Sequence, residues 1–112
     1  MTEGTCVRYL YGTGFVLFND LADQLSDFGG KIKVKVVKEN NQRGEKTLCY
    51  GLFYEDSKGR MYDVLQPSNF SLKVYNRSEP LLAIMKNKLG VEEIALPLLT
   101  EKNCIRKKEI NF

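Results

Sequence analysis

The residues best suited to chemistry in this sequence are basic and aromatic side chains that alternate with apolar ones. The segment KIKVKV places Lys31, Lys33 and Lys35 on one face of a predicted strand, because side chains of a strand point alternately to its two faces. Lys73 and Tyr75 share a face of a later predicted strand by the same rule. Ammonium groups contact phosphates and aromatic rings stack on bases, so these residues predict binding of single-stranded nucleic acid on a small sheet.

Further basic residues extend this candidate nucleic-acid site beyond the two strands. Arg43 lies in a polar loop between predicted strands, and a second basic cluster stands near the C-terminus. The net charge is only +3, so the total charge allows a basic face without requiring one. The predicted nucleic-acid-binding residues are Lys31, Lys33, Lys35, Arg43, Lys73, Tyr75, Arg106, Lys107 and Lys108.

The lysine row also has a structural interpretation. Lysines along a strand keep an exposed edge from pairing with another chain, and a polar outer face is ordinary in antiparallel sheets. The corresponding alternative function is a protein-protein interaction module, such as an adaptor, an inhibitor or a homodimer. Such a module would use a sheet edge or the apolar C-terminal segment that contains Ile94, Leu96, Leu98 and Leu99. The sequence leaves both partners open, a nucleic acid or a protein.

Residue types that catalysis usually needs are missing. The chain contains no histidine, which is the commonest general base and the usual partner of a serine or cysteine nucleophile. Its cysteines, Cys6, Cys49 and Cys104, are odd in number, far apart and without C-x-x-C spacing. That pattern argues against a disulfide framework and against a zinc site. We therefore expect a non-enzymatic protein with no metal and no cofactor.

Length and composition set the remaining limits. A chain of 112 residues with 43% hydrophobic and 28% charged residues predicts a single globular domain over residues 1–112. No apolar run approaches the roughly 18 residues that a membrane-spanning helix needs, and the N-terminal residues do not resemble a secretory leader. We therefore expect no membrane partner and a cytoplasmic or nuclear location.

The elements that must position the candidate residues follow from hydrophobic periodicity. Period-two alternation predicts strands, spacings of three and four predict helices, and glycine or proline punctuates the turns. A break in the alternation at Val36 and Val37 predicts a bulge or the end of that strand, and Gly51 predicts a bend or a close backbone approach. The expected elements are strands over 5–11, 31–36, 48–54, 60–65 and 70–75, helices over 15–28 and 78–89, and one or two short strands in the tail.

This order of elements predicts an α+β fold. We expect one small domain with a strongly bent antiparallel meander flanked by two helices. The layout is similar to that of Sm-like barrels and, in its later helix, to that of the OB-fold, so closure into a barrel is left open. The similarity concerns element order alone, because the sequence has no diagnostic motif of either family.

Overall fold

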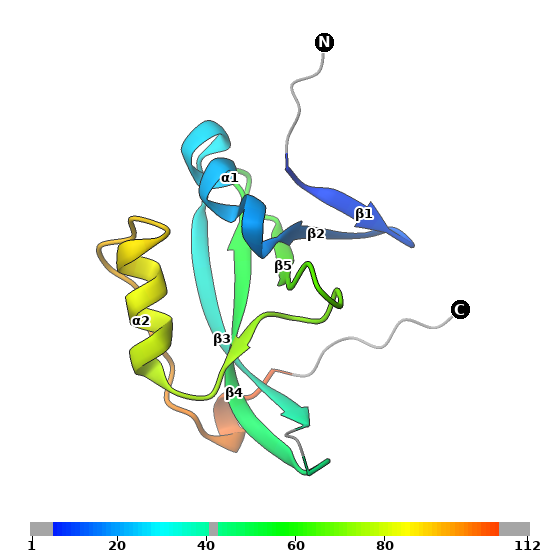
Figure 1. Cartoon of the computed structure of the whole chain (residues 1–112), viewed down its shortest axis with the longest axis vertical. Coiled ribbons are helices and arrows are strands. Elements are labelled where there is room, and N and C mark those ends of the chain that lie inside the picture. The colour runs from blue at the N-terminus through cyan, green and yellow to red at the C-terminus, as the bar shows by residue number, and fades with distance from the viewer. Residues whose placement is uncertain (1–5, 41–42, 106–112) are drawn as a thin grey trace.

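The computed structural model describes residues 6–40 and 43–105, apart from the side chain of Asn40. It contains six strands, two α-helices and two short 3₁₀ helices (Figure 1). The strands are β1 (Arg8–Leu10), β2 (Thr13–Leu17), β3 (Lys31–Asn40), β4 (Lys46–Glu55), β5 (Met61–Leu65) and β6 (Val74–Tyr75). The helices are η1 (Phe18–Asp20), α1 (Leu21–Phe28), α2 (Ser78–Asn87) and η2 (Glu101–Asn103).

The strands form one open, mostly antiparallel sheet. Their order is β1-β2-β5-β4-β3, and β6 pairs with β4 beyond the end of β5. The pairing of β2 with β5 is parallel, and every other ladder between the described strands is antiparallel. The predicted α+β class is confirmed, and the open order β1 to β3 excludes the barrel that the sequence left open.

The N-terminal prediction needs a correction, because residues 13–17 form β2 and not the start of a helix. Tyr11 and Gly12 have φ values of 52° and 78°, which suits the two-residue turn that joins twisted antiparallel strands. Phe15 and Val16 are both buried, one on each face of the sheet. Helical periodicity therefore begins only after η1, and α1 ends where the Gly29 N–H donates to the Leu25 carbonyl over 3.1 Å.

The predicted break at Val36 and Val37 is also wrong. The β3–β4 ladder runs without a bulge from Lys31 opposite Glu55 to Asn40 opposite Lys46. Val36 and Val37 are both buried because apolar residues cover both faces of the sheet at this point. The two consecutive valines therefore indicate a strand that is buried on both faces, and not a break in the strand.

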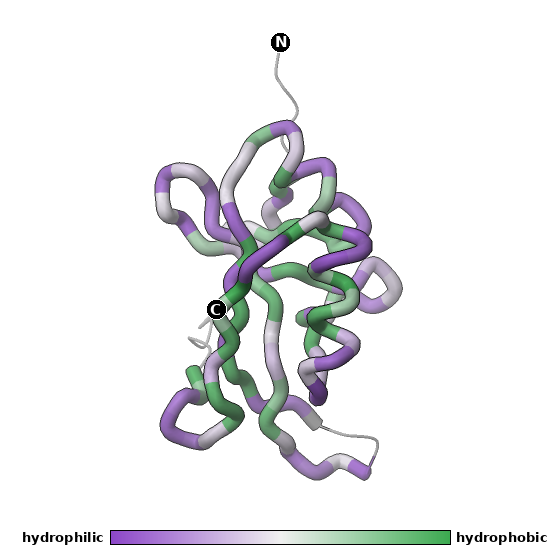
Figure 2. The backbone as a smooth tube through the Cα atoms, turned by 90° about the vertical axis from the view of Figure 1, so that its left-hand side faces the viewer, coloured by the Kyte–Doolittle hydropathy of each residue, from purple (hydrophilic) through white to green (hydrophobic). Residues whose placement is uncertain are grey.

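The larger of two apolar clusters lies between the sheet and the helices. Figure 2 shows apolar residues along the strands and polar residues in the connecting turns. At its centre the Tyr54 hydroxyl donates to the Gly29 carbonyl over 2.6 Å and accepts from the Gln24 amide over 3.1 Å. This main cluster comprises Val16, Phe18, Leu21, Ile32, Val34, Leu52, Tyr54, Tyr62, Val64, Leu81 and Met85.

A smaller cluster occupies the opposite face of the sheet. It contains Val37, Cys49, Phe53 and Leu72. A Cβ atom at Gly51 would lie 3.1 Å from Leu72 Cδ2 and 3.2 Å from the methyl groups of Val37, so the close approach at this glycine is made by side chains and not by another backbone. Both faces of the central strands are therefore packed, and the cluster on the helix side is the larger one.

The C-terminal part departs most from its prediction. The strand expected over 70–75 is reduced to β6 and one bridge between Leu65 and Leu72. In the tail, Cys104 forms a single parallel bridge with Val36, and residues 106–112 lie outside the described residues. Within residues 6–40 and 43–105, none of the helices has the length and apolar character to cross a membrane.

Candidate interaction edge on strand β3

The lysine row and the apolar row of β3 lie on opposite faces of the sheet, as the alternation predicted. Ile32 and Val34 belong to the main cluster, together with Leu21 of α1 and Leu81 of α2. The side chains of the lysines must then point away from the helices. The predicted inward face of β3 is confirmed.

The lysines differ in their electrostatic surroundings. Lys33 Nζ lies 3.6 Å from Glu55 Oε1, and Lys38, further along β3, lies 2.8 Å from Glu101 Oε1. Among the residues that the structure describes, no carboxylate lies within 4 Å of the ammonium groups of Lys31 and Lys35. Lys31 and Lys35 therefore present ammonium groups on this face that no described carboxylate pairs at that distance, and exposed ion pairs such as that of Lys33 are weak and screened by salt.

Lys73 and Tyr75 do not join that row. The Lys73 ammonium lies 5.0 Å from the ring centroids of both Phe18 and Tyr75, and Phe18 is part of the main cluster on the helix side. Tyr75 packs against the same cluster, and burial raises the pKa of its hydroxyl. The sheet therefore separates this cation–π group from Lys31, Lys33 and Lys35.

Arg43, the other predicted basic residue that the structure describes, does not lie in the lysine row either. Arg43 is exposed in the loop between β3 and β4, beyond the last pair of their ladder. Arg106, Lys107 and Lys108 lie outside the described residues. Of the six predicted nucleic-acid-binding residues that the structure describes, Lys31, Lys33 and Lys35 share one surface, and Lys73 and Tyr75 share another.

The backbone of β3 offers a feature that the side-chain pattern could not show. The Leu52 N–H donates to the Lys73 carbonyl over 3.0 Å, on the β6 side of β4. The backbone N–H and C=O groups of the even-numbered residues of β4 therefore point away from β3, and those of the odd-numbered residues hydrogen-bond with β3. In the ladder, odd residues of β3 stand opposite odd residues of β4. The N–H and C=O groups of Ile32 and Val34 consequently point outward from the sheet.

The far end of this outer edge has one partner. The Val36 carbonyl accepts a hydrogen bond from the Ile105 N–H over 2.9 Å. This bond confirms that the backbone groups of the even-numbered residues of β3 point outward from the sheet. In the described part of the chain, no such backbone partner stands beside Ile32 or Val34. An extended strand with outward, unpaired amides is a template for pairing with another chain.

Residues 91–97, which we name the strap, run beside this edge without joining the sheet. The Val91 N–H donates to the Met85 carbonyl over 2.8 Å. Between residues 92 and 97, the described chain makes no further backbone hydrogen bond. Side chains of Val91, Ile94 and Leu96 hold the strap by packing against the main cluster. Apolar contact alone thus fixes most of its length.

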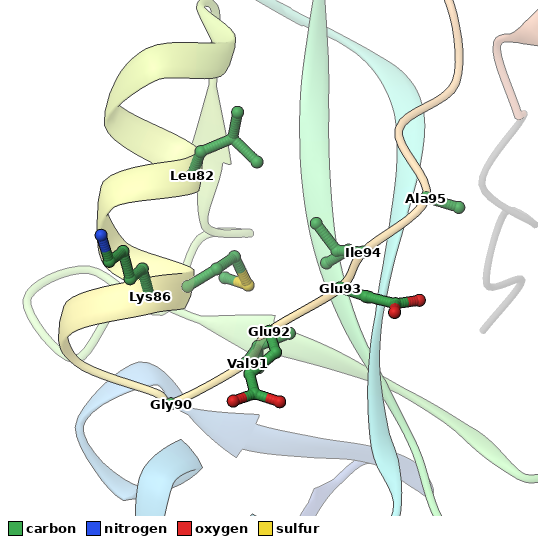
Figure 3. A pocket seen from close by; sticks show the side chains of 9 residues that line it. Leu82, Lys86, Gly90, Val91, Glu92, Glu93, Ile94 and Ala95 are labelled. Atoms are coloured by element: carbon green, nitrogen blue, oxygen red, sulfur yellow. The ribbon is translucent and has the colours of Figure 1, made fainter.

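The strap separates two hollows. The first, of about 650 Å³, lies between the strap and the β3 edge and is lined by Leu25, residues 30–35, residues 89–91 and residues 93–97. The second, of about 1080 Å³, lies between the strap and α2 (Figure 3). Leu82 and Lys86 of α2 face this second hollow, and Ile94 projects from the strap into the space between helix and sheet. Among the described residues, the edge of β3 at Ile32 and Val34 therefore borders the first hollow and not a paired strand.

No metal centre is formed by the described residues, since residues 6–40 and 43–105 contain no group of three His, Cys, Asp or Glu side chains that could hold an ion. Comparison with known proteins gave no matching family model, no matching curated protein and no matching solved structure.

Sequence reasoning named parts of this edge but not their arrangement. Ile94 and Leu96 were expected as interaction residues, yet both are half-buried and hold the strap. Leu98, from the same segment, is 75% exposed. Pro97 is the sequence signal for this arrangement, because a proline lacks an N–H and favours a chain that runs beside a sheet without pairing.

Proposed function

We propose that this chain is a non-enzymatic protein-interaction module that binds an extended segment of a partner by strand addition to the edge of β3. The observation that carries the proposal is the outward N–H and C=O groups of Ile32 and Val34 beside the hollow under the strap. Main-chain hydrogen bonds give affinity in strand addition, and side-chain pockets on alternate residues give specificity.

The two faces of β3 define the partner's chemistry. One face of an added strand would lie beside Lys31, Lys33 and Lys35, and the other beside Ile32 and Val34. Charge complementarity selects acidic side chains for the first face, and burial selects apolar side chains for the second. The partner segment is therefore extended, with acidic and apolar residues in alternation.

The strap supplies an internal precedent for this chemistry. Glu93 lines the same hollow as Lys31 and Lys35, and Ile94 and Leu96 of the strap pack on the main cluster. An acidic and apolar segment of this chain already lies beside the edge without hydrogen-bonding to it. A partner strand would add the main-chain bonds that the strap leaves unmade.

A second copy of the chain fits this edge less well. Pairing two β3 edges antiparallel would bring the lysine rows of both copies close together, and like charges opposite each other in a sheet are destabilising. The proposal therefore commits to an acidic segment of another protein. A concentration-dependent dimer that buries β3 would count against it.

The test uses a fluorescent synthetic peptide of alternating glutamate and valine, titrated by anisotropy against wild-type protein and two variants. Val34→Pro removes the outward N–H while sparing the ladder to β4, which uses the odd residues. Val34→Ala is the matched control, since it keeps the N–H and loses most of the side chain. We expect Val34→Pro to bind at least about tenfold more weakly than Val34→Ala.

Equal binding by the two variants would contradict strand addition. If Val34→Pro does not fold, as judged by circular dichroism, the double variant Lys31→Glu with Lys35→Glu replaces it. Those substitutions leave the backbone and the core unchanged, and we expect them to weaken peptide binding about tenfold. Unchanged binding by the double variant would overturn the acidic partner class, and so would equal affinity for a peptide of alternating lysine and valine.

Binding of single-stranded nucleic acid stays a second candidate function. It is favoured by Lys31 and Lys35, which share an outer face and have no carboxylate within 4 Å among the described residues. It predicts an affinity for oligothymidylate that falls steeply with salt and is insensitive to Val34→Pro. Absent or salt-insensitive binding would contradict this candidate.

A further inference from the structure

A third hollow lies at the tip of the β1–β2 hairpin. Its volume is about 310 Å³, near the lower end of small ligand pockets. Three parts of the chain contribute to it: the hairpin, β5 and the loop between β5 and β6. The lining residues are Leu10, Tyr11, Thr13, Phe15, Asp63, Leu65, Phe70, Ser71 and Leu72. The hairpin residues belong to the end of the sheet order opposite to β3, whereas Leu72 also packs in the smaller cluster with Val37 of β3.

Two aromatic residues of this hollow have an unfavourable backbone conformation. Tyr11 and Phe70 have φ values of 52° and 56°, and they are the two non-glycine residues with positive φ in the described chain. Both are exposed, Tyr11 to 79% and Phe70 to 48%. Asparagine or glycine would adopt these conformations more readily, so turn geometry does not explain why aromatic rings stand here.

The loop that carries Phe70 is firmly held. The Phe70 N–H donates to the Gln66 carbonyl over 2.8 Å, and the Ser71 N–H donates to Asn69 Oδ1 over 3.0 Å. The ring of Phe70 meets the buried ring of Phe15 edge to face, with centroids 5.7 Å apart. The exposed aromatic wall is thus fixed before any ligand arrives.

The charge of the hollow favours a cation. Asp63 is the charged residue among the described lining residues, and aromatic faces carry negative quadrupole potential that attracts cations. Asp63 and Tyr11 also have other interactions of their own, and Asp63 forms part of the wall of the hollow. Leu10, Leu65 and Leu72 supply apolar surface for a long aliphatic stem.

We infer that this hollow, which we name the tip pocket, binds an arginine or lysine side chain of a partner protein, with Asp63 facing the cationic group and the rings of Tyr11, Phe15 and Phe70 around its stem. The inference is independent of strand addition at β3, since the two sites share no residue. It assigns the exposed hairpin tip a partner of opposite charge to the one proposed for β3.

The test titrates isotopically labelled full-length protein with the capped tripeptide Gly-Arg-Gly and follows amide shifts by NMR. The matched ligand is Gly-citrulline-Gly, which keeps the shape and loses the charge. We expect the arginine peptide to shift the Phe70 and Asp63 amides and to bind about tenfold more tightly than the citrulline peptide. Equal affinity for both peptides would overturn the cationic ligand class.

Two variants locate the site. Asp63→Asn should weaken the arginine peptide about tenfold and leave the citrulline peptide unchanged, and Phe70→Asn should weaken both peptides while accepting the positive φ. Val34→Pro should change neither titration. Arginine binding that survives both Asp63→Asn and Phe70→Asn contradicts the tip pocket. Binding of vesicles of zwitterionic phosphatidylcholine that Tyr11→Asn abolishes would replace the protein partner with a membrane surface.

Discussion

The sheet ends in the ten-residue strand β3 on one side and in the three-residue strand β1 on the other. β3 rests on the main cluster through buried side chains, whereas every residue of β1 is exposed. Short edge strands offer little for another chain to pair with, and long ones need separate protection. On β3 the protection consists of lysines, the bridge at Cys104 and the unpaired strap.

This difference separates two ways of presenting a binding surface. At β3 the available groups are backbone amides on a well-packed strand. At the β1–β2 tip they are exposed side chains on a strained turn. We expect substitutions near β3 to cost stability and substitutions at the tip to cost little or to stabilise, because apolar burial dominates folding energy and strain opposes it.

The largest contrast should come from a matched pair of leucine truncations. Leu81 of α2 is fully buried over β3, whereas Leu10 at the tip is 50% exposed. We expect Leu81→Ala to lower the free energy of unfolding by about 3 kcal/mol and Leu10→Ala by less than about 0.5 kcal/mol. Urea denaturation of both variants measures the difference. Equal losses would contradict the unequal packing of the two regions.

A smaller effect should follow from removing one hydroxyl in the main cluster. Tyr54→Phe removes one hydrogen bond from the Gly29 carbonyl and one from the Gln24 amide. We expect this to lower the free energy of unfolding by about 2 kcal/mol. Tyr75→Phe is the matched control, since no side-chain hydrogen bond of Tyr75 is found in the described part of the chain. A loss for Tyr54→Phe that does not exceed that of the control would refute this role of the hydroxyl.

At the tip we expect a gain. Tyr11→Asn places a residue that tolerates positive φ at a turn position with φ of 52°, and it should raise the free energy of unfolding by about 1 kcal/mol. Tyr11→Ala, which loses the ring but keeps the strain, should not stabilise the protein. Thermal melts of both variants provide the comparison. If Tyr11→Asn destabilises the protein more than Tyr11→Ala does, the strain argument is wrong.

The smallest effect at neutral pH belongs to Tyr62, whose pKa is raised to about 12 by burial first, and then by hydrogen bonds with Tyr9 and Asp56. Its hydroxyl donates to Asp56 Oδ2 over 3.2 Å. Because the folded pKa exceeds the ordinary value of 10.0, this stabilisation is complete below pH 10 and is lost as pH rises toward 12. Tyr62→Phe should flatten the fall in melting temperature over that range, and an unchanged slope would contradict the assignment.

Periodicity predicted those parts of the fold whose pattern has one solution. The hairpin of β4 and β5, the amphipathic helix α2 and the buried face of β3 all follow from alternation or from spacings of three and four. The prediction that a helix begins at Phe15 is wrong, because a short apolar run occurs both in helices and in strands that are buried on both faces. Gly12 was the better guide, since a turn there requires positive φ.

The candidate site was less predictable because it depends on relative positions. The alternation in the sequence predicted a row of lysines on β3 and a shared face for Lys73 and Tyr75. It could not show that the sheet separates Lys33 from Tyr75. Whether the Val34 amide points outward depends on which residue pairs of β3 and β4 are hydrogen-bonded to each other. The local sequence pattern does not encode that choice. The parallel pairing of β2 with β5, distant in sequence, was inaccessible for the same reason.

Amide hydrogen exchange at residues 32–35, followed with and without the alternating glutamate and valine peptide, tests the central claim most directly. In the free protein, the outward amides of Ile32 and Val34 should exchange faster than those of Lys33 and Lys35, which pair with β4. Bound peptide should slow Ile32 and Val34 and leave Lys33 and Lys35 unchanged. Peptide binding that leaves the exchange of Ile32 and Val34 unaltered would contradict strand addition at β3.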